Sequence, residues 1–217
     1  MQIGVAIEVI SSEIDRRGPN MQTSKIEPAE PDVCQDLPVW VDHGVRGARM
    51  AKCDPEHLRA AEEAFQHRRW PLTLSGDPGI GKSCLAACLY RRQSGPVIWC
   101  NWSDAVRCLA RCWSAGRCEW PKTNSLDTLT REESWLRKAF FEAPLVVFDE
   151  LGIRAPSEPQ IEAGVNLLNL RAGKPTIITT NRGSAWIADL HGEAFASRLA
   201  NGVFAALKGE DRRLRRG

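Results

Sequence analysis

The stretch from Leu74 to Cys84 reads LSGDPGIGKSC, and it decides the fold class. From Gly76 onward it fits the pattern G-x-x-x-x-G-K-[ST], which is typical of a phosphate-binding loop. It follows a short strand-like run at residues 71–75 and precedes a helical pattern over residues 82–93. Glycines let successive backbone N–H groups turn toward phosphate oxygens, and the helix that follows adds its positive dipole end. The strand–loop–helix context argues against a chance match in a structural turn.

Each residue of this loop has a predicted part in binding a nucleotide. Lys82 supplies a positive charge for the β- and γ-phosphates, and the hydroxyl of Ser83 is a ligand for Mg²⁺. The sequence therefore predicts a site for ATP and Mg²⁺. The predicted nucleotide-binding residues are Gly76, Asp77, Pro78, Gly79, Ile80, Gly81, Lys82, Ser83 and Cys84.

A second motif is APLVVFDELG at residues 143–152, where an apolar run leads into Asp149 and Glu150. The carboxyl end of a strand is where open α/β sheets bind their ligands. An aspartate there can hold Mg²⁺ through water, and a glutamate beside it can orient a water for attack on the γ-phosphate. Paired acids can also be solvated turn residues, but the upstream loop favours the catalytic interpretation.

Two further residues are candidates for catalysis. Asn181 ends the run TIITTN and can help to place the attacking water; capping of the turn NRGS is the alternative. Arg198 is a candidate arginine finger, which would act on ATP bound to a neighbouring subunit. A surface arginine on a short helix is the alternative, and the residues alone do not decide between the two.

The chain alternates apolar runs with helical patterns from Trp40 onward, which predicts an α/β fold with a parallel sheet. A capping box from Thr130 to Glu133 is expected to start one helix. The expected strands are residues 71–75, 97–100, 145–149, 176–180 and 203–207. The expected helices are residues 54–70, 82–93, 103–114, 130–142, 157–173 and 193–200.

The composition sets wider limits. A chain of 217 residues with 43% hydrophobic residues suits one domain with a real core. Residues 1–36 are rich in proline and acidic groups and are expected to form a flexible arm, with a short strand or helix at residues 3–10. Residues 37–217 form the expected core. No apolar run is long enough for a membrane span, and the N-terminus is unlike a signal peptide, so a cytoplasmic protein is expected.

The net charge of +2 means that any case for nucleic acid must rest on local patches. Residues 99–122 interleave tryptophans with cations, a pattern that suits single-stranded DNA because bases stack on the rings. The alternative is that Trp113 is a core residue and that Arg107 and Arg111 lie on a solvated helix face. The basic tail RRLRR is a second candidate. The residues of the pattern are Trp99, Trp102, Trp113, Trp120, Arg107, Arg111, Arg117 and Lys122.

The chain has eight cysteines and no C-x-x-C motif. Cys108, Cys112 and Cys118 could in principle hold zinc, although their spacing is unusual for such a site. Small buried hydrophobic residues are the favoured interpretation.

Together these motifs resemble the AAA+ ATPases of the DnaC/DnaI helicase-loader and IstB transposition-ATPase clade. The resemblance covers roughly residues 40–217 and rests on GDPGIGKS, LVVFDELG, TIITTN and SRLANGVFAALKGEDRR. It implies a P-loop NTPase of the AAA+ type, with a parallel sheet of about five strands sandwiched by helices. No full C-terminal lid domain is expected, since nineteen residues follow Arg198.

The resemblance also implies a function. It implies ATP hydrolysis at the subunit interfaces of a homo-oligomer, assembly on DNA, and Arg198 as the finger. It suggests that Arg212 or Arg213 approaches the nucleotide. The first hypothesis is a helicase loader that binds ATP–Mg²⁺ and single-stranded DNA and remodels or loads a replicative helicase. Loaders of this kind usually carry an N-terminal module that grips the helicase, so here either the arm folds on contact with the helicase or the protein serves another client.

The alternative is an IstB-like helper that binds duplex DNA and a transposase. A small-molecule kinase fits less well, because the sequence shows no arginine-rich lid. A GTPase fits less well again, because the N-K-x-D base reader is missing. An inactive ATP-binding module is disfavoured, because every catalytic residue type is present.

Overall fold

The computed structural model describes residues 37, 41, 45 and 48 and the ranges 53–93, 96–121 and 128–212. The expected arm at residues 1–36, including the strand or helix expected at residues 3–10, lies outside the described residues. None of the helices in the described ranges has the length and hydropathy needed to cross a membrane.

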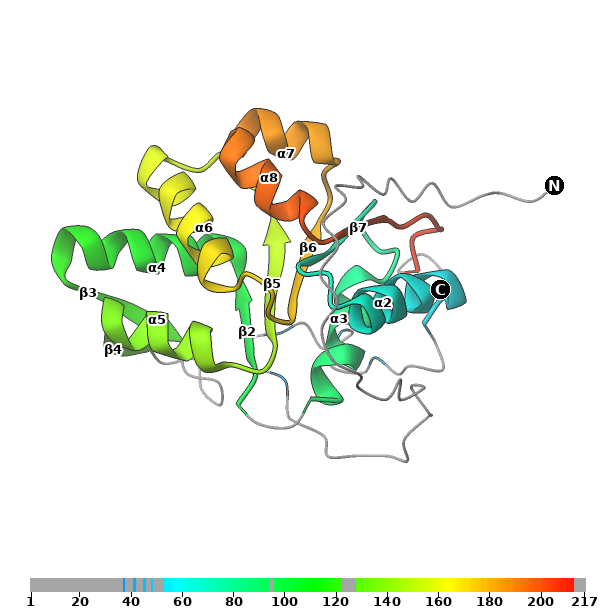
Figure 1. Cartoon of the computed structure of the whole chain (residues 1–217), viewed down its shortest axis with the longest axis horizontal. Helices are drawn as coiled ribbons and strands as arrows, with labels where there is room; N and C mark the ends of the chain where they lie inside the picture. Colours follow the sequence, from blue (N-terminus) through cyan, green and yellow to red (C-terminus); the bar gives the residue numbers. More distant parts are fainter. Residues whose placement is uncertain are drawn as a thin grey trace, which may run out of the picture.

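A parallel sheet of five strands forms the centre of the molecule, as predicted (Figure 1). Its strand order is β2-β5-β6-β1-β7, and every neighbouring pair is parallel. Strand β1, which precedes the phosphate loop, therefore lies beside β6. Strand β6 in turn lies beside β5. The strands are β1 Leu72–Ser75, β2 Ile98–Asn101, β5 Val146–Leu151, β6 Thr176–Thr180 and β7 Val203–Ala206.

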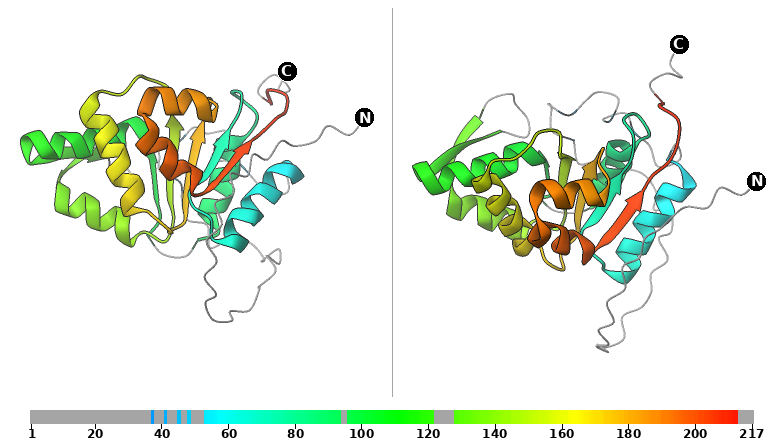
Figure 2. Two further views of the ribbon diagram at one scale, coloured as in Figure 1. Left: turned by 45° about the horizontal axis from the view of Figure 1, so that its top comes forward. Right: turned by 90° about the horizontal axis from the view of Figure 1, so that it is seen from above.

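Helices cover both faces of this sheet, which makes three layers (Figures 1 and 2). Helices α2 and α3 cover one face, and α4, α5, α6, α7 and α8 lie on the other. Among the helices from α2 to α8, which lie in the described ranges, only α7 has no counterpart among the expected helices. The helices are α2 Pro55–His67, α3 Lys82–Arg91, α4 Trp102–Ala115, α5 Glu133–Glu142, α6 Glu158–Leu170, α7 Ser184–His191 and α8 Glu193–Ala200.

Strand β5 shows how the sequence builds the two sides. Side chains alternate across a strand, so Leu145 and Val147 pack into one core while Val146 and Phe148 pack into the other. All four are completely buried. This is why the run reads as continuously apolar, as expected for a central parallel strand.

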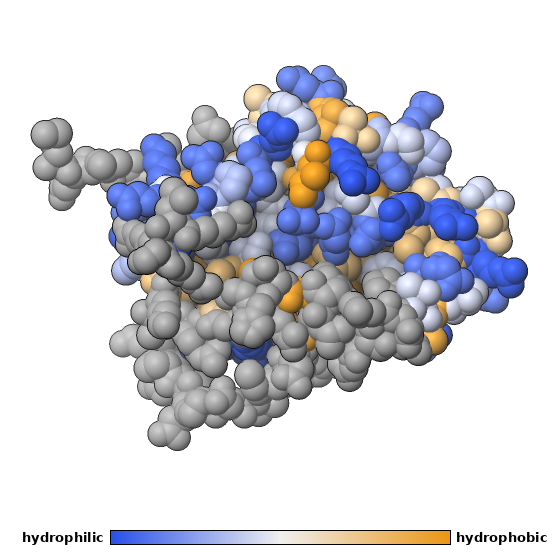
Figure 3. All heavy atoms as spheres, turned by 180° about the vertical axis from the view of Figure 1, so that it is seen from behind, coloured by the Kyte–Doolittle hydropathy of each residue, from blue (hydrophilic) through white to orange (hydrophobic). Residues whose placement is uncertain are grey.

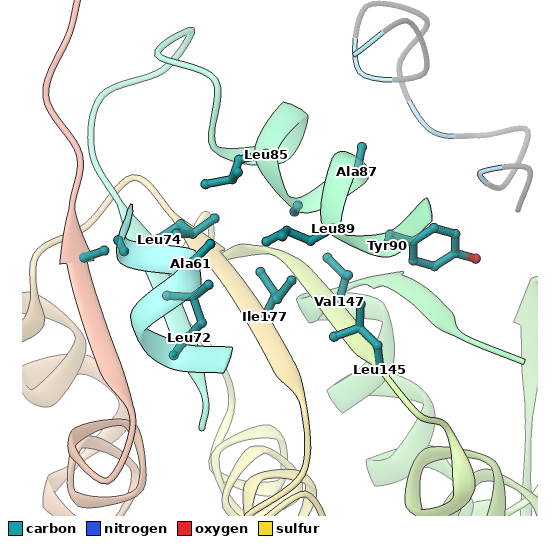
Figure 4. Packing of buried hydrophobic residues seen from close by; sticks show 14 of the residues in the cluster. Ala61, Leu72, Leu74, Leu85, Ala87, Leu89, Tyr90, Leu145, Val147 and Ile177 are labelled. Atoms are coloured by element: carbon teal, nitrogen blue, oxygen red, sulfur yellow. The ribbon is translucent and has the colours of Figure 1, made fainter. Parts of the chain in front are cut away.

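The first core lies between the sheet and helices α2 and α3. Leu72 and Leu74 of β1 meet Ile177 of β6, and Leu85 and Leu89 of α3 cover them (Figure 4). All five side chains are buried. The packing fixes the start of α3 over the carboxyl end of β1, which is where the phosphate loop lies.

The second core is aromatic. Trp102 makes edge-to-face contacts with Phe148 and Phe195 at ring-centroid distances of 5.2 and 5.4 Å. Phe140 lies against Phe148 at 5.6 Å. Such pairs add stability beyond the burial of their area. They join α4, α5 and α8 to β5.

The predicted capping box is wrong. Residues Thr128–Glu132 form a strand, β4, which pairs antiparallel with β3 at Arg117–Pro121, and α5 begins only at Glu133. The hydroxyl of Thr130 donates to Glu119 Oε1 at 3.1 Å instead of capping a helix. Cross-strand pairing with a segment that precedes it by about ten residues therefore outcompetes the local capping signal.

Candidate nucleotide-binding site

The loop between β1 and α3 has the backbone that its glycines permit. Gly76, Gly79 and Gly81 have φ angles of 145°, 82° and 105°, which residues with side chains rarely adopt. A Cβ at Gly76 would lie 2.4 Å from the carbonyl oxygen of Leu207. The loop therefore curls tightly and presents its backbone at the start of α3, where the helix dipole favours an anion.

Lys82, the first residue of α3, is buried beneath this loop. Its ammonium group donates to the carbonyl oxygens of Gly76 and Asp77 at 2.7 and 2.8 Å. These bonds hold the positive charge inside the curl of the loop. The role of Lys82 as a charge for phosphate oxygens stays a prediction.

Asp149 lies at the carboxyl end of β5, opposite the start of α3. Its Oδ1 accepts a hydrogen bond from the hydroxyl of Ser83 at 2.9 Å and another from the hydroxyl of Thr179. Burial raises the pKa of Asp149, and the two hydroxyl donors and the charge of Lys82 oppose that rise. The tertiary fold thus brings together the two predicted metal ligands, Ser83 and Asp149.

These two oxygen ligands fit Mg²⁺. Magnesium is usually held by one or two carboxylates together with substrate phosphates and water. A cage built from protein alone would need more ligands, and no group of three or more His, Cys, Asp or Glu side chains suited to a metal occurs among the described residues. The donor set at Ser83 and Asp149 therefore matches a metal that arrives with a nucleotide.

Glu150 lies in a β-bulge of β5. Phe148 is level with Ile178, but Leu151 is level with Thr180, so β5 has one residue more than β6 over this stretch. Glu150 has a φ of 65°, an uncommon value for a residue with a side chain. Bulges of this kind redirect side chains next to functional sites. Glu150 is consequently exposed at the carboxyl end of β5.

Sequence reasoning missed two residues that hold this acidic pair. Asn101, the last residue of β2, donates through Nδ2 to Glu150 Oε2 at 2.8 Å. Thr179 accepts the backbone N–H of Glu150 at 3.0 Å and donates to Asp149. Both lie at the ends of strands that flank β5. The rule that led to Asn181, a polar residue at a strand end, would have found Asn101 had the strand order been known.

Asn181 and Arg198 are the other predicted catalytic residues. Asn181 follows β6 directly and is exposed, between the ends of β1 and β5 in the strand order. Arg198 lies on α8, where Nε donates to Asn169 Oδ1 at 2.7 Å and Nη1 donates to Ala194 O at 2.6 Å. These partners belong to α6 and α8, so the hydrogen bonds of Arg198 hold it on the surface formed by those helices.

The segment after β7 lies across the phosphate loop. The N–H of Leu207 donates to Ser75 O at 2.7 Å, and the N–H of Arg212 donates to Gly79 O at 3.1 Å. The guanidinium of Arg212 lies 4.0 Å from a carboxylate oxygen of Asp54. Arg212 therefore reaches the loop, whereas Arg213 lies outside the described residues.

The tryptophans do not form the predicted stacking surface. Trp99 and Trp102 are only 4% and 2% exposed and belong to opposite cores. Trp113 and Trp120 are partly buried against the second core. The expectation that these rings stack on bases is therefore wrong for Trp99 and Trp102. Trp99 of β2 is buried in the first core, and Trp102 packs among the aromatic residues of the second core.

The cations of the same region are on the surface. Arg107 and Arg111 are exposed on α4, and Arg107 pairs with Asp104 at 2.6 Å. Lys122 and most of the basic tail lie outside the described residues. On the face opposite to that of Figure 1, hydrophilic side chains are numerous and hydrophobic ones are scattered (Figure 3).

The three clustered thiols are buried as expected. Cys108, Cys112 and Cys118 all pack into the second core. Burial is the first cause of the raised pKa of each thiol. They therefore behave as small apolar side chains at neutral pH.

Comparison with known proteins supports the fold. No protein-family model matches the sequence, and no curated protein matches it either. Solved structures do match. A crystal structure of DnaI superposes with a TM-score of 0.57 at 15% identity, covering 78% of this chain and 95% of the chain in that structure. The DnaC helicase loader gives a TM-score of 0.54 at 22% identity, covering 71% of this chain and 92% of that one.

DnaA from Aquifex aeolicus, solved with AMPPCP bound, gives a TM-score of 0.58 at 14% identity. The match covers 76% of this chain and 49% of that DnaA chain, so this protein spans about half its length. A structure of the replication initiator DnaA bound to AMPPCP and single-stranded DNA gives a TM-score of 0.59 at 14% identity. The chain thus shares the fold of these proteins, and its parallel sheet covered by helices on both faces is the α/β fold that the motifs predicted.

Proposed function

We propose that the protein is an ATPase of the helicase-loader type, which binds ATP–Mg²⁺ and single-stranded DNA and remodels or loads a replicative helicase. The observation that carries the ATPase part is the convergence of Lys82, Ser83, Asp149 and Glu150 at one edge of the sheet, where the Ser83–Asp149 hydrogen bond joins the two motifs. Nothing in the primary order requires residues 66 positions apart to meet there.

The residues divide the chemistry among them. Backbone N–H groups of Gly76–Ser83 and the ammonium of Lys82 bind the phosphates. Ser83 and Asp149 would hold Mg²⁺, which supplies positive charge to the phosphate oxygens when bound. Glu150 orients a water and accepts its proton, and Asn181 helps to place that water.

Asn101 gives Glu150 a defined position. The hydrogen bond to Oε2 fixes one oxygen of the carboxylate. Asn101 also accepts the N–H of Ser103 at the start of α4. Movement of α4 would therefore shift the position of the Glu150 carboxylate.

An oligomer completes the proposed site. Arg198 is partly exposed and is held by Asn169 of α6 and Ala194 of α8, which suits a finger that reaches ATP on a neighbouring subunit. Arg212 acts in its own subunit, where it already lies against the loop. ATP hydrolysis would then occur only in the assembled oligomer.

Substitution of Glu150 tests the catalytic part. Glu150→Gln preserves size and hydrogen bonding but removes the base, so turnover should fall by roughly 10²-fold or more while ATP binding is retained. Glu193→Gln, at an exposed position on α8, is the matched control and should hydrolyse ATP normally. Normal turnover in Glu150→Gln would refute the role of Glu150, and a wild-type protein without turnover would refute the ATPase proposal.

The DNA part is supported by the likeness to the DnaC and DnaI structures and to DnaA solved with single-stranded DNA. Since Trp99 and Trp102 are buried, contact would come through phosphate binding by exposed cations such as Arg111. Phosphate binding without base stacking also suits duplex DNA. The second candidate function is therefore an IstB-like helper that binds duplex DNA and a transposase.

Fluorescence anisotropy separates these candidates. Labelled single-stranded and duplex DNA of equal length are compared at one salt concentration, with ATP, ADP or no nucleotide. An ATP-dependent preference for the single strand favours the loader, and a preference for the duplex favours the transposition helper. Arg111→Gln should weaken binding, whereas Arg59→Gln on the distant helix α2 should not. Binding to neither DNA would indicate a protein client alone.

A further inference from the structure

Two thiols from distant parts of the chain lie side by side near the phosphate loop. Cys53 directly precedes Asp54, the residue that caps α2, and Cys88 lies within α3. Their sulfur atoms are 3.8 Å apart, and 35 positions separate them in the sequence. A disulfide has a sulfur–sulfur distance of about 2.05 Å, so the two atoms need to approach by roughly 1.8 Å.

The two thiols have different surroundings, which gives them different chemical roles. Cys53 is half-buried, whereas Cys88 is only 4% exposed. The two thiols share a hydrogen bond, and this bond together with the nearby charge of Arg212 lowers the pKa of Cys53. Cys53 is therefore the accessible nucleophile, because the thiolate is the reactive form.

Cys88 is suited to the second step. Its pKa is raised, first by the hydrogen bond to Cys53 and then by burial and by the charge on Cys53. Once Cys53 has been oxidised, both effects of Cys53 disappear, and the charge of Arg91 still favours the Cys88 thiolate. The pair thus has an attacking thiol on the outside and a resolving thiol behind it.

We propose that Cys53 and Cys88 form a redox-active pair that low-molecular-weight disulfides, such as oxidised glutathione, convert into an intramolecular disulfide. The Cys53 thiolate attacks one sulfur of the reagent, whose S–S bond breaks and releases one thiolate. Cys88 then loses its proton and attacks Cys53 Sγ, expelling the second thiolate. Two protein thiols are oxidised, and one reagent disulfide is reduced to two thiols.

The bond would brace the nucleotide site. Helix α3 begins with Lys82 and Ser83, so Cys88 is part of the element that carries the phosphate loop. Next to Cys53, Asp54 contacts Arg212, whose N–H donates to Gly79 O. The disulfide would therefore tie the start of α2 to α3 on the side of the loop where the C-terminal segment lies.

Peptide mapping tests this proposal directly. The reduced full-length protein is incubated with mixtures of reduced and oxidised glutathione, alkylated and digested with trypsin without reduction. The expected product joins CDPEHLR (53–59) to SCLAACLYR (83–91). Because the second peptide holds both Cys84 and Cys88, the Cys84→Ala variant makes the assignment unambiguous and should still form the link.

The controls decide between this pair and the other thiols. Cys53→Ser should abolish the link, and oxidation should raise the Tm of the Cys84→Ala protein by roughly 10 °C because the bond closes a long loop. Three outcomes would overturn the proposal: a glutathione adduct that persists on Cys53, a link that uses other cysteines, or thiols that all remain reduced. The mapping needs no ATP turnover, so it stands apart from the proposed function.

Discussion

Replacing Thr179 with valine should destabilise the protein, whereas the same replacement at Thr73 should not. The two threonines form a matched pair. They lie on the neighbouring strands β6 and β1 and are 1% and 0% exposed. Valine has nearly the same shape as threonine, so each substitution tests the hydroxyl group and leaves the packing almost unchanged.

The hydroxyl of Thr179 has two partners. It accepts the backbone N–H of Glu150 at 3.0 Å and donates to the carboxylate of Asp149. The Glu150 N–H is only part-buried, so its loss of a partner costs less than the about 1–3 kcal/mol of a buried group, and a hydrogen bond to a charged group contributes about 1.5–3 kcal/mol. Asp149 keeps the hydrogen bond from Ser83, so the expected loss in the free energy of unfolding is about 2–4 kcal/mol.

The hydroxyl of Thr73 is buried and has no hydrogen-bond partner among the described residues. Burying an unpaired hydroxyl costs about 1–3 kcal/mol on scales drawn from protein variants. A methyl group in its place removes that cost. Thr73→Val should therefore leave the free energy of unfolding unchanged or raise it by about 1 kcal/mol.

The effect at Thr179 should also depend on pH. Burial raises the pKa of Asp149, and the Thr179 hydroxyl opposes the rise, so Thr179→Val should raise this pKa further. A carboxyl whose folded pKa lies above its unfolded value stabilises the protein fully below the unfolded pKa, and that contribution is lost as pH rises through the folded pKa. The destabilisation by Thr179→Val should thus be larger at pH 8 than at pH 5.

Urea unfolding followed by far-UV circular dichroism measures these differences at both pH values. The slope of the free energy against urea should be the same for all three proteins, so that the midpoints report stability. Equal midpoints for the two variants would refute the assignment of hydrogen bonds at Asp149. A difference that does not change with pH would refute the electrostatic part alone.

Three further outcomes are expected. Gly202→Ala should destabilise the fold by more than about 2 kcal/mol in urea unfolding, because its Cβ would lie 1.9 Å from the backbone oxygen of Pro71, which has little room to move. Arg198→Ala should bind labelled ATP normally but lose turnover. Mixing this variant with Lys82→Ala should restore part of the ATPase activity. Normal turnover in Arg198→Ala would refute the finger hypothesis. Burial lowers the pKa of His191 to about 4, so stability should fall as pH drops from about 6.5 toward 4. His191→Phe should flatten that profile in Tm measurements, and an unchanged profile would show that His191 is not the group responsible.

The sequence by itself was enough for the parts of the molecule that depend on neighbouring residues. The phosphate loop, the apolar run of β5 with its acidic end, and the alternation that predicts a parallel sheet are all local patterns. Backbone conformation at Gly76, Gly79 and Gly81 follows from the absence of a Cβ. These features could be predicted because local sterics and hydrophobic periodicity do not need the strand order.

Local signals failed where a distant segment competed with them. Thr130 looked like a helix cap, but pairing of β4 with β3 uses its hydroxyl. Trp99 and Trp102 looked like a binding surface beside their cations, but each covers one face of the sheet. A tryptophan gains more from burial against other apolar side chains than from exposure, and the sequence does not show which neighbours will be available.

Only the tertiary structure decided which polar groups surround the acidic pair. Asn101 and Thr179 reach Glu150 and Asp149 because β2 and β6 flank β5 in the sheet. Strand order is set by how the helices pack on both faces, which is a sum over many long-range contacts. The sequence thus determined which residues are candidates for a nucleotide site, and the packing of the sheet determined which side chains surround them.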